Sequence, residues 1–277
     1  MRRLLGLVVC SLGLLTGPTA DASTSNPAFL GVGMQDLGTN GSGPCSIVTI
    51  TKDSGAHAAG LRIDDVFVAI DGVPVANCNA LITEIQAREA GTSVDIRVSR
   101  ARGETTITAK LLSRADVLRQ RIVGQTMPIS TLVRVDTEQQ EDLSSRGETT
   151  IVGWFDQRRC RGCEQVFATI ARWARKHSRR GTPITAVAAT VAGDNRSLFE
   201  SIRELKPYER ALDVPLLVAD RDTFLDVTIT DVDRIHFMVI DSRGIVQYVA
   251  PLLPDADDKA AVLEELFAAA EQTARRK

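Results

Sequence analysis

The chain has 277 residues, of which 44% are hydrophobic and 25% are charged. This is the composition of a soluble globular protein, and the length gives room for two domains of ordinary size. The formal net charge is −2 and the basic residues are dispersed along the sequence, so the sequence predicts no nucleic-acid-binding surface.

The first residues have the pattern of a secretory signal peptide. Met1-Arg2-Arg3 is followed by an apolar run over residues 4–15 and by a small-residue segment that ends at Ala22. The apolar run is shorter than the ~18–20 residues that a membrane span needs. We therefore expect residues 1–22 to be removed and the protein to be exported, with a bacterial periplasm as the compartment that fits. The mature chain is then expected to have no membrane span, and an uncleaved anchor is the alternative.

Four cysteines remain after such cleavage, and export places them where disulfides form. Two of them make the motif Cys160-Arg-Gly-Cys163, which follows an apolar run over 149–155 and precedes a helical stretch over 164–176. At the N-terminus of a helix, unpaired N–H groups and the helix dipole favour a thiolate on the first cysteine. The second cysteine lies one turn away, where it can resolve a mixed disulfide. The motif thus predicts thiol–disulfide exchange.

Three cations surround this pair: Arg158, Arg159 and Arg161. A guanidinium is permanently charged, so it stabilises a thiolate without accepting its proton. A stabilised thiolate favours the reduced pair and makes the disulfide more oxidising, which predicts an oxidant or an isomerase over a strong reductant.

Residues 29–112 are predicted to form a small, mainly β domain. Short apolar runs rich in β-branched residues predict strands over 31–34, 46–51, 66–70, 94–98 and 105–111. Leu81, Ile82 and Ile85 stand at helical spacing and predict one main helix over 79–90. Asp71-Gly72 predicts a tight turn.

Two consecutive segments of this domain carry a family resemblance. Residues 53–66 read Asp-Ser-Gly-Ala-His-Ala-Ala-Gly-Leu-Arg-Ile-Asp-Asp-Val, and residues 67–75 continue Phe-Val-Ala-Ile-Asp-Gly-Val-Pro-Val. They resemble the PDZ domains of bacterial HtrA-type proteases, with Asp64 in place of a glycine and Asp71 in place of an asparagine. The resemblance covers 29–112 and implies a small β sandwich or partly open barrel with one main helix.

The resemblance also implies a peptide-binding groove. The loop that would hold a C-terminal carboxylate consists of Phe29, Leu30, Gly31 and Val32. Converging N–H groups would bind the carboxylate there, and the next strand edge would accept the peptide as an extra strand. Leu81 and Ile85 would line the side-chain pocket, although the same spacing suits core residues. No protease domain accompanies the module, so we expect it to bind a C-terminal or extended peptide segment of a partner protein without cutting it.

The layout of such a domain also brings two distant cysteines together. Cys45 begins a strand and Cys78 precedes the main helix. We therefore predict a structural disulfide between them, with two buried thiols as the alternative.

The second half of the chain follows a different pattern. Residues 113–121 are charged and contain neither proline nor glycine, so they are interpreted as a short connector, with a helix as one option, rather than as a long flexible linker. From Ile122 onward, strands alternate with longer helices, which predicts an α/β domain. The predicted strands cover 129–135, 150–155, 184–189, 216–218, 236–240 and 245–249, and the predicted helices cover 164–177, 197–209 and 257–275.

Residues 122–277 resemble thioredoxin-fold proteins of the TlpA/ResA kind. The resemblance rests on Gly124-Gln-Thr-Met-Pro128, on Asp142-Leu143 ahead of a glycine, and on the apolar strand that leads to Phe155. It implies an α/β thioredoxin-like fold with a central mixed sheet and no dissociable cofactor. It also implies that Cys160 is the attacking nucleophile, that Cys163 is the resolving thiol, and that the substrate is a protein thiol or disulfide.

Some positions depart from that family. Arg159 and Gly162 replace its usual tryptophan and proline, and no proline lies between residues 215 and 251. The loop expected to face the cysteines therefore has Ile235 where a cis-proline is usual, and His236 becomes a candidate neighbour of the sulfurs. A histidine there would support a thiolate or complete a metal site. No second Cys-x-x-Cys is present, so no metal is expected.

These patterns predict an exported protein that recruits a partner through a PDZ module and exchanges disulfides through its Cys-x-x-Cys pair. The alternative belongs to another class: an adaptor without catalytic activity, in which the Cys-x-x-Cys is a structural disulfide. A peroxidase is disfavoured, because residues 157–160 lack the Pro-x-x-x-Thr-x-x-Cys approach that such a thiol needs.

Overall fold

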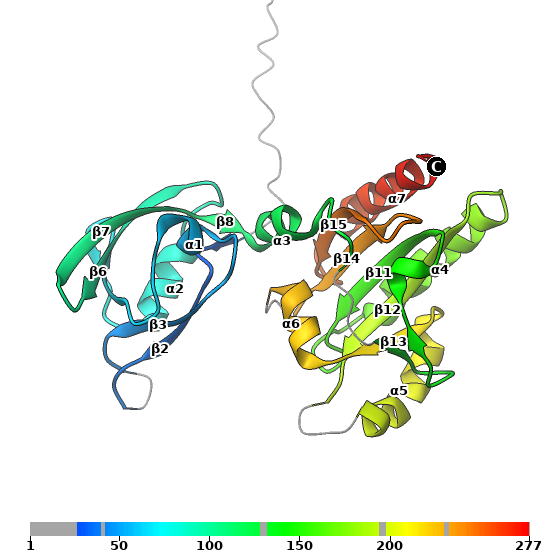
Figure 1. Ribbon diagram of the computed structural model, residues 1–277, viewed down its shortest axis with the longest axis horizontal. Coiled ribbons are helices and arrows are strands. Elements are labelled where there is room, and N and C mark those ends of the chain that lie inside the picture. Colours follow the sequence, from blue (N-terminus) through cyan, green and yellow to red (C-terminus); the bar gives the residue numbers. More distant parts are fainter. Residues whose placement is uncertain (1–26, 40–41, 128–131, 194–197, 230–232, 277) are drawn as a thin grey trace, which may run out of the picture.

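Two domains lie side by side in the computed structural model (Figure 1). The structure describes residues 27–39, 42–127, 132–193, 198–229 and 233–276. The predicted signal peptide, 1–22, lies outside the described residues. Among the described residues, no helix is long and apolar enough to cross a membrane.

The first domain is built on a six-stranded sheet in the order β2-β3-β4-β6-β7, with β5 paired to β4. The neighbouring strands are antiparallel. The strands are β2 (Val32–Asp36), β3 (Cys45–Ile50), β4 (Val66–Ile70), β5 (Val73–Pro74), β6 (Ser93–Arg100) and β7 (Gly103–Lys110). The helices are α1 (Gly55–Ala59) and α2 (Cys78–Gln86), and β1 (Ala28–Phe29) pairs with β8 (Leu112–Ser113). The small, mainly β domain with one main helix is as predicted.

Local sequence explains these elements. In β6, Val94, Ile96 and Val98 are buried and alternate with exposed residues, as expected of a strand with one covered face. Between β4 and β5, Asp71 and Gly72 both have positive φ, 48° and 82°. Two consecutive left-handed residues characterise the tight turn of a two-residue hairpin, so the predicted turn is confirmed.

A covalent clamp holds α2 against the sheet. A disulfide joins Cys45, the first residue of β3, to Cys78, the first residue of α2, with 4.8 Å between the Cα atoms. The carboxylate of Asp36, the last residue of β2, accepts a hydrogen bond from the backbone N–H of Cys78 at 2.8 Å. The N-terminus of α2 is therefore fixed to both β2 and β3.

The second domain has a seven-stranded mixed sheet in the order β10-β9-β13-β12-β11-β14-β15. Strand β11 is parallel to β12 and antiparallel to β14, and β14 is antiparallel to β15. The strands are β9 (Leu132–Arg134), β10 (Gln140–Glu141), β11 (Thr149–Phe155), β12 (Ile184–Val191), β13 (Leu216–Ala219), β14 (Ile235–Ile240) and β15 (Val246–Leu252). The predicted α/β domain with a central mixed sheet is confirmed, and its β11-α4-β12 and β14-β15-α7 units make it thioredoxin-like.

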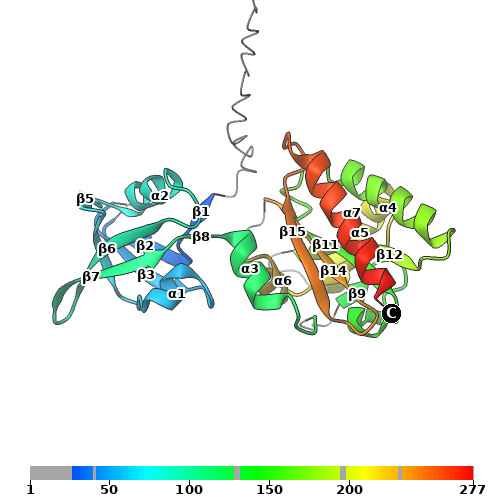
Figure 2. The same cartoon turned by 90° about the horizontal axis from the view of Figure 1, so that it is seen from above.

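Helices cover both faces of this sheet (Figure 2). One core forms between the sheet and α4 (Cys163–Ser178), α5 (Leu198–Leu212) and α7 (Lys259–Arg275). A second core forms on the other face, against α3 (Arg114–Ile122) and α6 (Arg221–Thr228). Strand β11 contributes alternate residues to the two cores. At Gly153, an added Cβ would lie 2.6 Å from the rings of Phe167 and Phe237, so only glycine permits this packing.

The segment predicted as a connector, 113–121, is largely helix α3. Ser113 caps the helix by accepting a hydrogen bond from the N–H of Asp116 at 2.9 Å. Val117 and Leu118 are fully buried in the second core, and α3 packs on β15. The segment therefore packs as part of the second domain, in keeping with the expectation that it is not a long flexible linker. Burial of its few apolar residues depends on a distant strand, which the local charge pattern does not show.

The contribution of the first domain's disulfide to the free energy of unfolding can be tested by mutation. Replacing Cys45 and Cys78 by Ala should lower the free energy of unfolding by about 3–4 kcal/mol, because the bond closes a loop of 33 residues in the unfolded chain. The matched control is Cys160→Ala/Cys163→Ala, whose cysteines are 3 residues apart and whose loss should stay below ~2 kcal/mol. Urea unfolding with amide exchange in β3 and β11 separates the two domains. Equal losses for both pairs would contradict the expectation.

Candidate functional site

The Cys-x-x-Cys turn connects β11 to α4. Cys160 and Cys163 are joined by a disulfide, with 5.8 Å between their Cα atoms. The carbonyl of Asp156 accepts hydrogen bonds from the N–H groups of Arg159 and Cys160, both at 3.0 Å, and closes the turn. Gly162 caps α4 with φ +79°. Proline is restricted to a φ near −65°, so this backbone explains why the proline of the related motif is absent.

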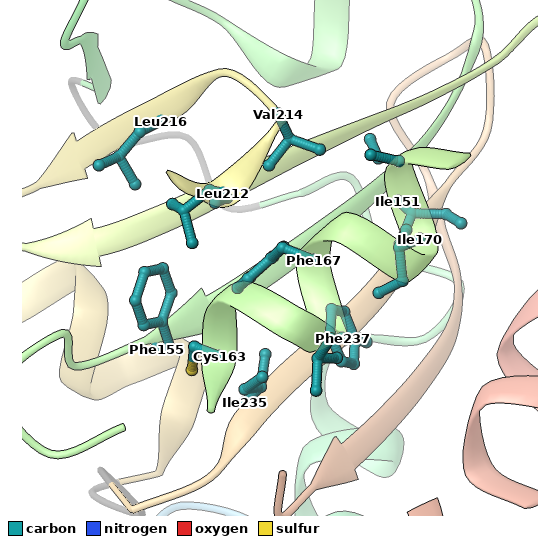
Figure 3. Close-up of a cluster of buried hydrophobic side chains, with 14 of the residues drawn as sticks. Ile151, Phe155, Cys163, Phe167, Ile170, Leu212, Val214, Leu216, Ile235 and Phe237 are labelled. Carbon is teal, nitrogen blue, oxygen red and sulfur yellow. The ribbon is translucent and has the colours of Figure 1, made fainter. Parts of the chain in front are cut away.

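The two sulfurs differ in their access to solvent. Cys163 is fully buried, whereas Cys160 is half-buried at the edge of the same core. Figure 3 shows Cys163 at the first turn of α4, beside Phe155 and Ile235. A large reactant in solvent therefore meets Cys160 first, and Cys163 can act only from within the protein.

Two of the three arginines near the pair are neutralised by carboxylates. Arg158 contacts both oxygens of Asp156, each at 3.1 Å, and Asp156 is only 3% exposed. Arg159 pairs with Asp233 at 3.3 Å. Within the described part of the chain, Arg161 makes no ion pair and is exposed. The uncompensated positive field at Cys160 therefore comes from Arg161 and the N-terminus of α4.

A tyrosine and a glutamate lie on the buried side of this helix end. Tyr208 packs beside Phe155, with 6.1 Å between the ring centroids. Burial is the main cause that raises the pKa of the Tyr208 phenol well above its usual range, and the carboxylate of Glu164 raises it further. The phenol therefore stays neutral wherever a thiol titrates.

Strand β14 begins opposite the pair. Ile235 is fully buried in the core that contains Cys163, so an aliphatic side chain occupies the predicted position. His236 is 2% exposed and pairs in register with Trp154. Side chains alternate along a strand, so His236 faces the other core, together with Met238 and away from the sulfurs. The structure does not bring His236 to the cysteine pair.

Side chains that could hold a metal ion gather at one place among the described residues. The sole group of three ligand-type side chains there is Asp36, Cys45 and Cys78. Both sulfurs of that group are already bonded to each other. The group therefore acts as the clamp described above.

A pocket of 410 Å³ opens next to the turn. It lies where β11 and β12 end and α6 begins, and it is lined by Asp156, Arg158, Arg159, Val191, Arg221, Phe224 and Leu225. Its lining combines the ion-paired Arg158 and Arg159 with Arg221 and with apolar side chains from the end of β12 and from α6. Sequence reasoning missed α6, although the spacing Asp220-x-x-Thr223 signals its start: the Asp220 carboxylate accepts from the Thr223 N–H at 2.9 Å.

In the first domain, α2 lies against β2, the two elements between which the peptide-binding groove is predicted. Strand β2 is an edge strand of the sheet, so one side of its backbone is open to an added strand. The loop before it contains Gly31, at φ +90°, where an added Cβ would lie 2.0 Å from the Cβ of Ser54. Glycine is therefore required at the point where the predicted carboxylate loop turns.

Most of the other residues predicted for the groove are buried in the core of the first domain. Leu30, Leu81 and Ile85 are 2%, 0% and 6% exposed and belong to the domain core. Phe29 is half-buried, contacts the second domain's core, and carries the guanidinium of Arg114 over its ring at 4.5 Å.

The exposed apolar side chain of α2 is Ile82, at 38%. Half-buried Val32 and Met34 project from β2. These three residues are the better candidates for the groove lining. The spacing of apolar residues in the sequence predicted the helix. Adjacent residues of a helix point about 100° apart, so Leu81 can face the core while its neighbour Ile82 is exposed.

Comparisons with known proteins agree with this division of the chain. The PDZ domain family profile matches residues 28–111. No curated protein matches the chain.

Among solved structures, the chain is similar to the HtrA-type protease AlgW with a decapeptide, at 20% identity and a TM-score of 0.29, over 31% of this chain and 29% of that one. It thus spans less than a third of that protease. It is also similar to the HtrA3 PDZ domain bound to a phage-derived ligand (FGRWV), at 17% identity and 0.27, over 30% and 84%. A third is BsSco, a Sco-family cytochrome c oxidase assembly protein with a disulfide switch, at 12% identity and 0.42, over 55% and 95%.

The sheet orders and the family match together define the two halves of the molecule. The first half has helix α2 beside the edge strand β2, and the second half has the cysteine turn at the end of β11 in its mixed sheet. Residues 28–111 of this chain match the PDZ domain family, and they precede a domain with a thioredoxin-like fold.

Proposed function

We propose that this is an exported protein that recruits a protein segment in its PDZ groove and exchanges disulfides through Cys160 and Cys163. The observation that carries the proposal is the unequal access of the two sulfurs at the N-terminus of α4, with Cys160 half-buried and Cys163 fully buried. An exchange reaction needs one sulfur that meets the substrate and a second that is held beside it.

The proposed chemistry starts from the closed pair. A substrate thiolate attacks the Cys160 sulfur, the bond between Cys160 and Cys163 breaks, and Cys163 leaves as a thiolate. A second substrate thiolate then attacks the mixed disulfide at the substrate sulfur, which forms a substrate disulfide and releases Cys160. The substrate loses two electrons and the cysteine pair gains them. A thiol or disulfide partner protein must reset the pair, and no dissociable cofactor is needed.

Recruitment would use the open edge of β2. An extended or C-terminal peptide would add to that edge by main-chain hydrogen bonds, with its side chains against Ile82, Val32 and Met34. A terminal carboxylate would lie at the Gly31 turn. The signal-peptide pattern of residues 1–22 supports export, and a bacterial periplasm would supply the oxidising environment.

An adaptor without catalytic activity is the second candidate. Ile235 stands in place of the proline that aligns a substrate backbone in related proteins, and carboxylates offset two of the three arginines. Both observations favour a disulfide that only fixes the start of α4. The assay below distinguishes the two candidates.

The exchange reaction predicts a division of labour between the cysteines. Cys160→Ser should abolish both reduction of insulin disulfides and oxidation of a reduced substrate, a loss of at least about 100-fold. It removes the nucleophile of the reduction and the disulfide sulfur that a substrate thiolate attacks in the oxidation. Cys163→Ala should instead accumulate mixed disulfides that survive non-reducing electrophoresis. Wild-type protein that is inactive in both assays would establish the adaptor.

The electrostatics of the turn predict unequal effects of neighbouring arginines. Arg161→Gln should slow alkylation of reduced Cys160 by iodoacetamide about two- to fivefold, because it removes the uncompensated cation. Arg159→Gln, on the other side of Cys160, is the matched control and should leave the rate near that of the wild type, since Asp233 offsets its charge. A larger effect at Arg159 would contradict this assignment.

The groove predicts which apolar residue matters for peptide binding. A library of displayed peptides with free C-termini should be enriched by the wild-type chain, and Ile82→Lys should weaken the selected peptides by about tenfold, the loss of one apolar contact. Ile63→Lys is the control, since Ile63 is 58% exposed and lies outside α2 and β2. Equal losses for the two variants would argue against the groove.

A further inference from the structure

The far end of α4 carries a stripe of five exposed cations. They follow the spacing i, i+3, i+4, i+7 and i+8 over the last two turns and the residues just after them: Arg172, Arg175, Lys176, Arg179 and Arg180. This spacing places all five on one face of a helix. The basic residues are dispersed along the sequence as a whole, but these five lie together on one face of the folded protein.

Little negative charge opposes this stripe. Arg175 pairs with Asp213 at 2.7 Å. In the described part of the chain, Arg172, Lys176, Arg179 and Arg180 make no ion pair. Cations near a helix C-terminus complement the dipole, but like charges four residues apart repel one another. The four cations without an ion pair therefore leave a positively charged surface, which an anionic binding partner would neutralise.

The five cations of the stripe also surround a pocket. A pocket of 360 Å³ is lined only by its five cations. An adjoining pocket of 420 Å³ shares Arg175 and Arg179 with it, and its lining also contains Arg146 and the carboxylates of Glu148 and Asp213. Guanidinium groups that converge on a pocket suit tetrahedral anions, because each can donate two parallel hydrogen bonds to two oxygens.

We propose that this face binds the phosphates of anionic phospholipids and holds the protein at a membrane surface. Large apolar residues that are exposed in the described chain, Leu37, Ile63, Val73 and Ile82, all lie in the first domain. A specific protein partner would need an apolar centre in the interface, whereas the pocket within the stripe is lined by cations alone. Four of the five cations are arginines, whose forked donors match phosphate.

The position of the stripe fits such contact. Helix α4 has 16 residues and is therefore about 24 Å long, with the cysteine pair at one end and the stripe at the other. The end of α4 lies at the edge of the second domain, away from the first (Figure 1). A bilayer bound there leaves Cys160 and the peptide groove accessible.

The test is sedimentation of the exported chain with vesicles of phosphatidylcholine alone or with three-tenths phosphatidylglycerol. Each neutralised cation near the surface should weaken partitioning about fivefold. The variant R172Q/K176Q/R179Q/R180Q, which keeps the Arg175–Asp213 pair, should therefore bind the anionic vesicles at least about 100-fold more weakly. Binding of the wild type should also fall steeply with salt.

A second variant controls for net charge. K52Q/R62Q/R102Q/K110Q removes the same charge from exposed positions of the first domain and should bind the anionic vesicles like the wild type. Far-UV circular dichroism verifies that both variants are folded. Equal binding to the two vesicle types, or equal loss in both variants, would overturn the proposal. Tighter binding to polyglutamate or to duplex DNA than to the anionic vesicles would also overturn it, in favour of an acidic protein or a nucleic acid.

Discussion

Burial of β11 on both faces is the constraint on which the cysteine turn depends. All seven of its residues are buried, with Ile151 and Phe155 against one helical layer and Val152 and Trp154 against the other. A shift by one residue would exchange the two layers, so the register of the strand is fixed. The turn therefore leaves the sheet at a set position, and the packing of Phe167 against Gly153 fixes the helix that receives it.

Helix α4 uses its two ends for opposite electrostatic purposes. Its N-terminus has the partial positive charge that favours a thiolate, and its C-terminus has the partial negative charge that tolerates a cluster of cations. Around the cysteines, Asp156 and Asp233 pair with two of the three arginines, whereas Arg175 is the one cation of the far stripe that has an ion pair among the described residues, with Asp213. The near-neutral sequence thus folds into a domain with a balanced end and a strongly positive one.

Local signals predicted much of the fold, and contacts between distant residues decided the rest. Alternation in β6, the Asp71-Gly72 turn and the burial of β11 are properties of short segments, so the sequence indicates them. The helical character of 114–122 depends on β15, and the pairing of Arg159 depends on an acid 74 residues later in the chain. The spacing of residues in the sequence predicts neither of these long-range contacts. The spacing of the five cations can be read from the sequence, but the net charge and the distribution of basic residues over the whole chain do not show it.

The absence of a free linker has a mechanical consequence. Strand β8 ends at Ser113, which caps α3, and α3 is already part of the second core. On the proposed function, a segment held in the groove and a cysteine presented to Cys160 must lie a fixed distance apart. A tether of this kind raises the effective concentration only for clients whose cysteine is spaced to match. The protein would then select its substrates by the spacing between the bound segment and the reactive cysteine, as well as by the sequence of that segment.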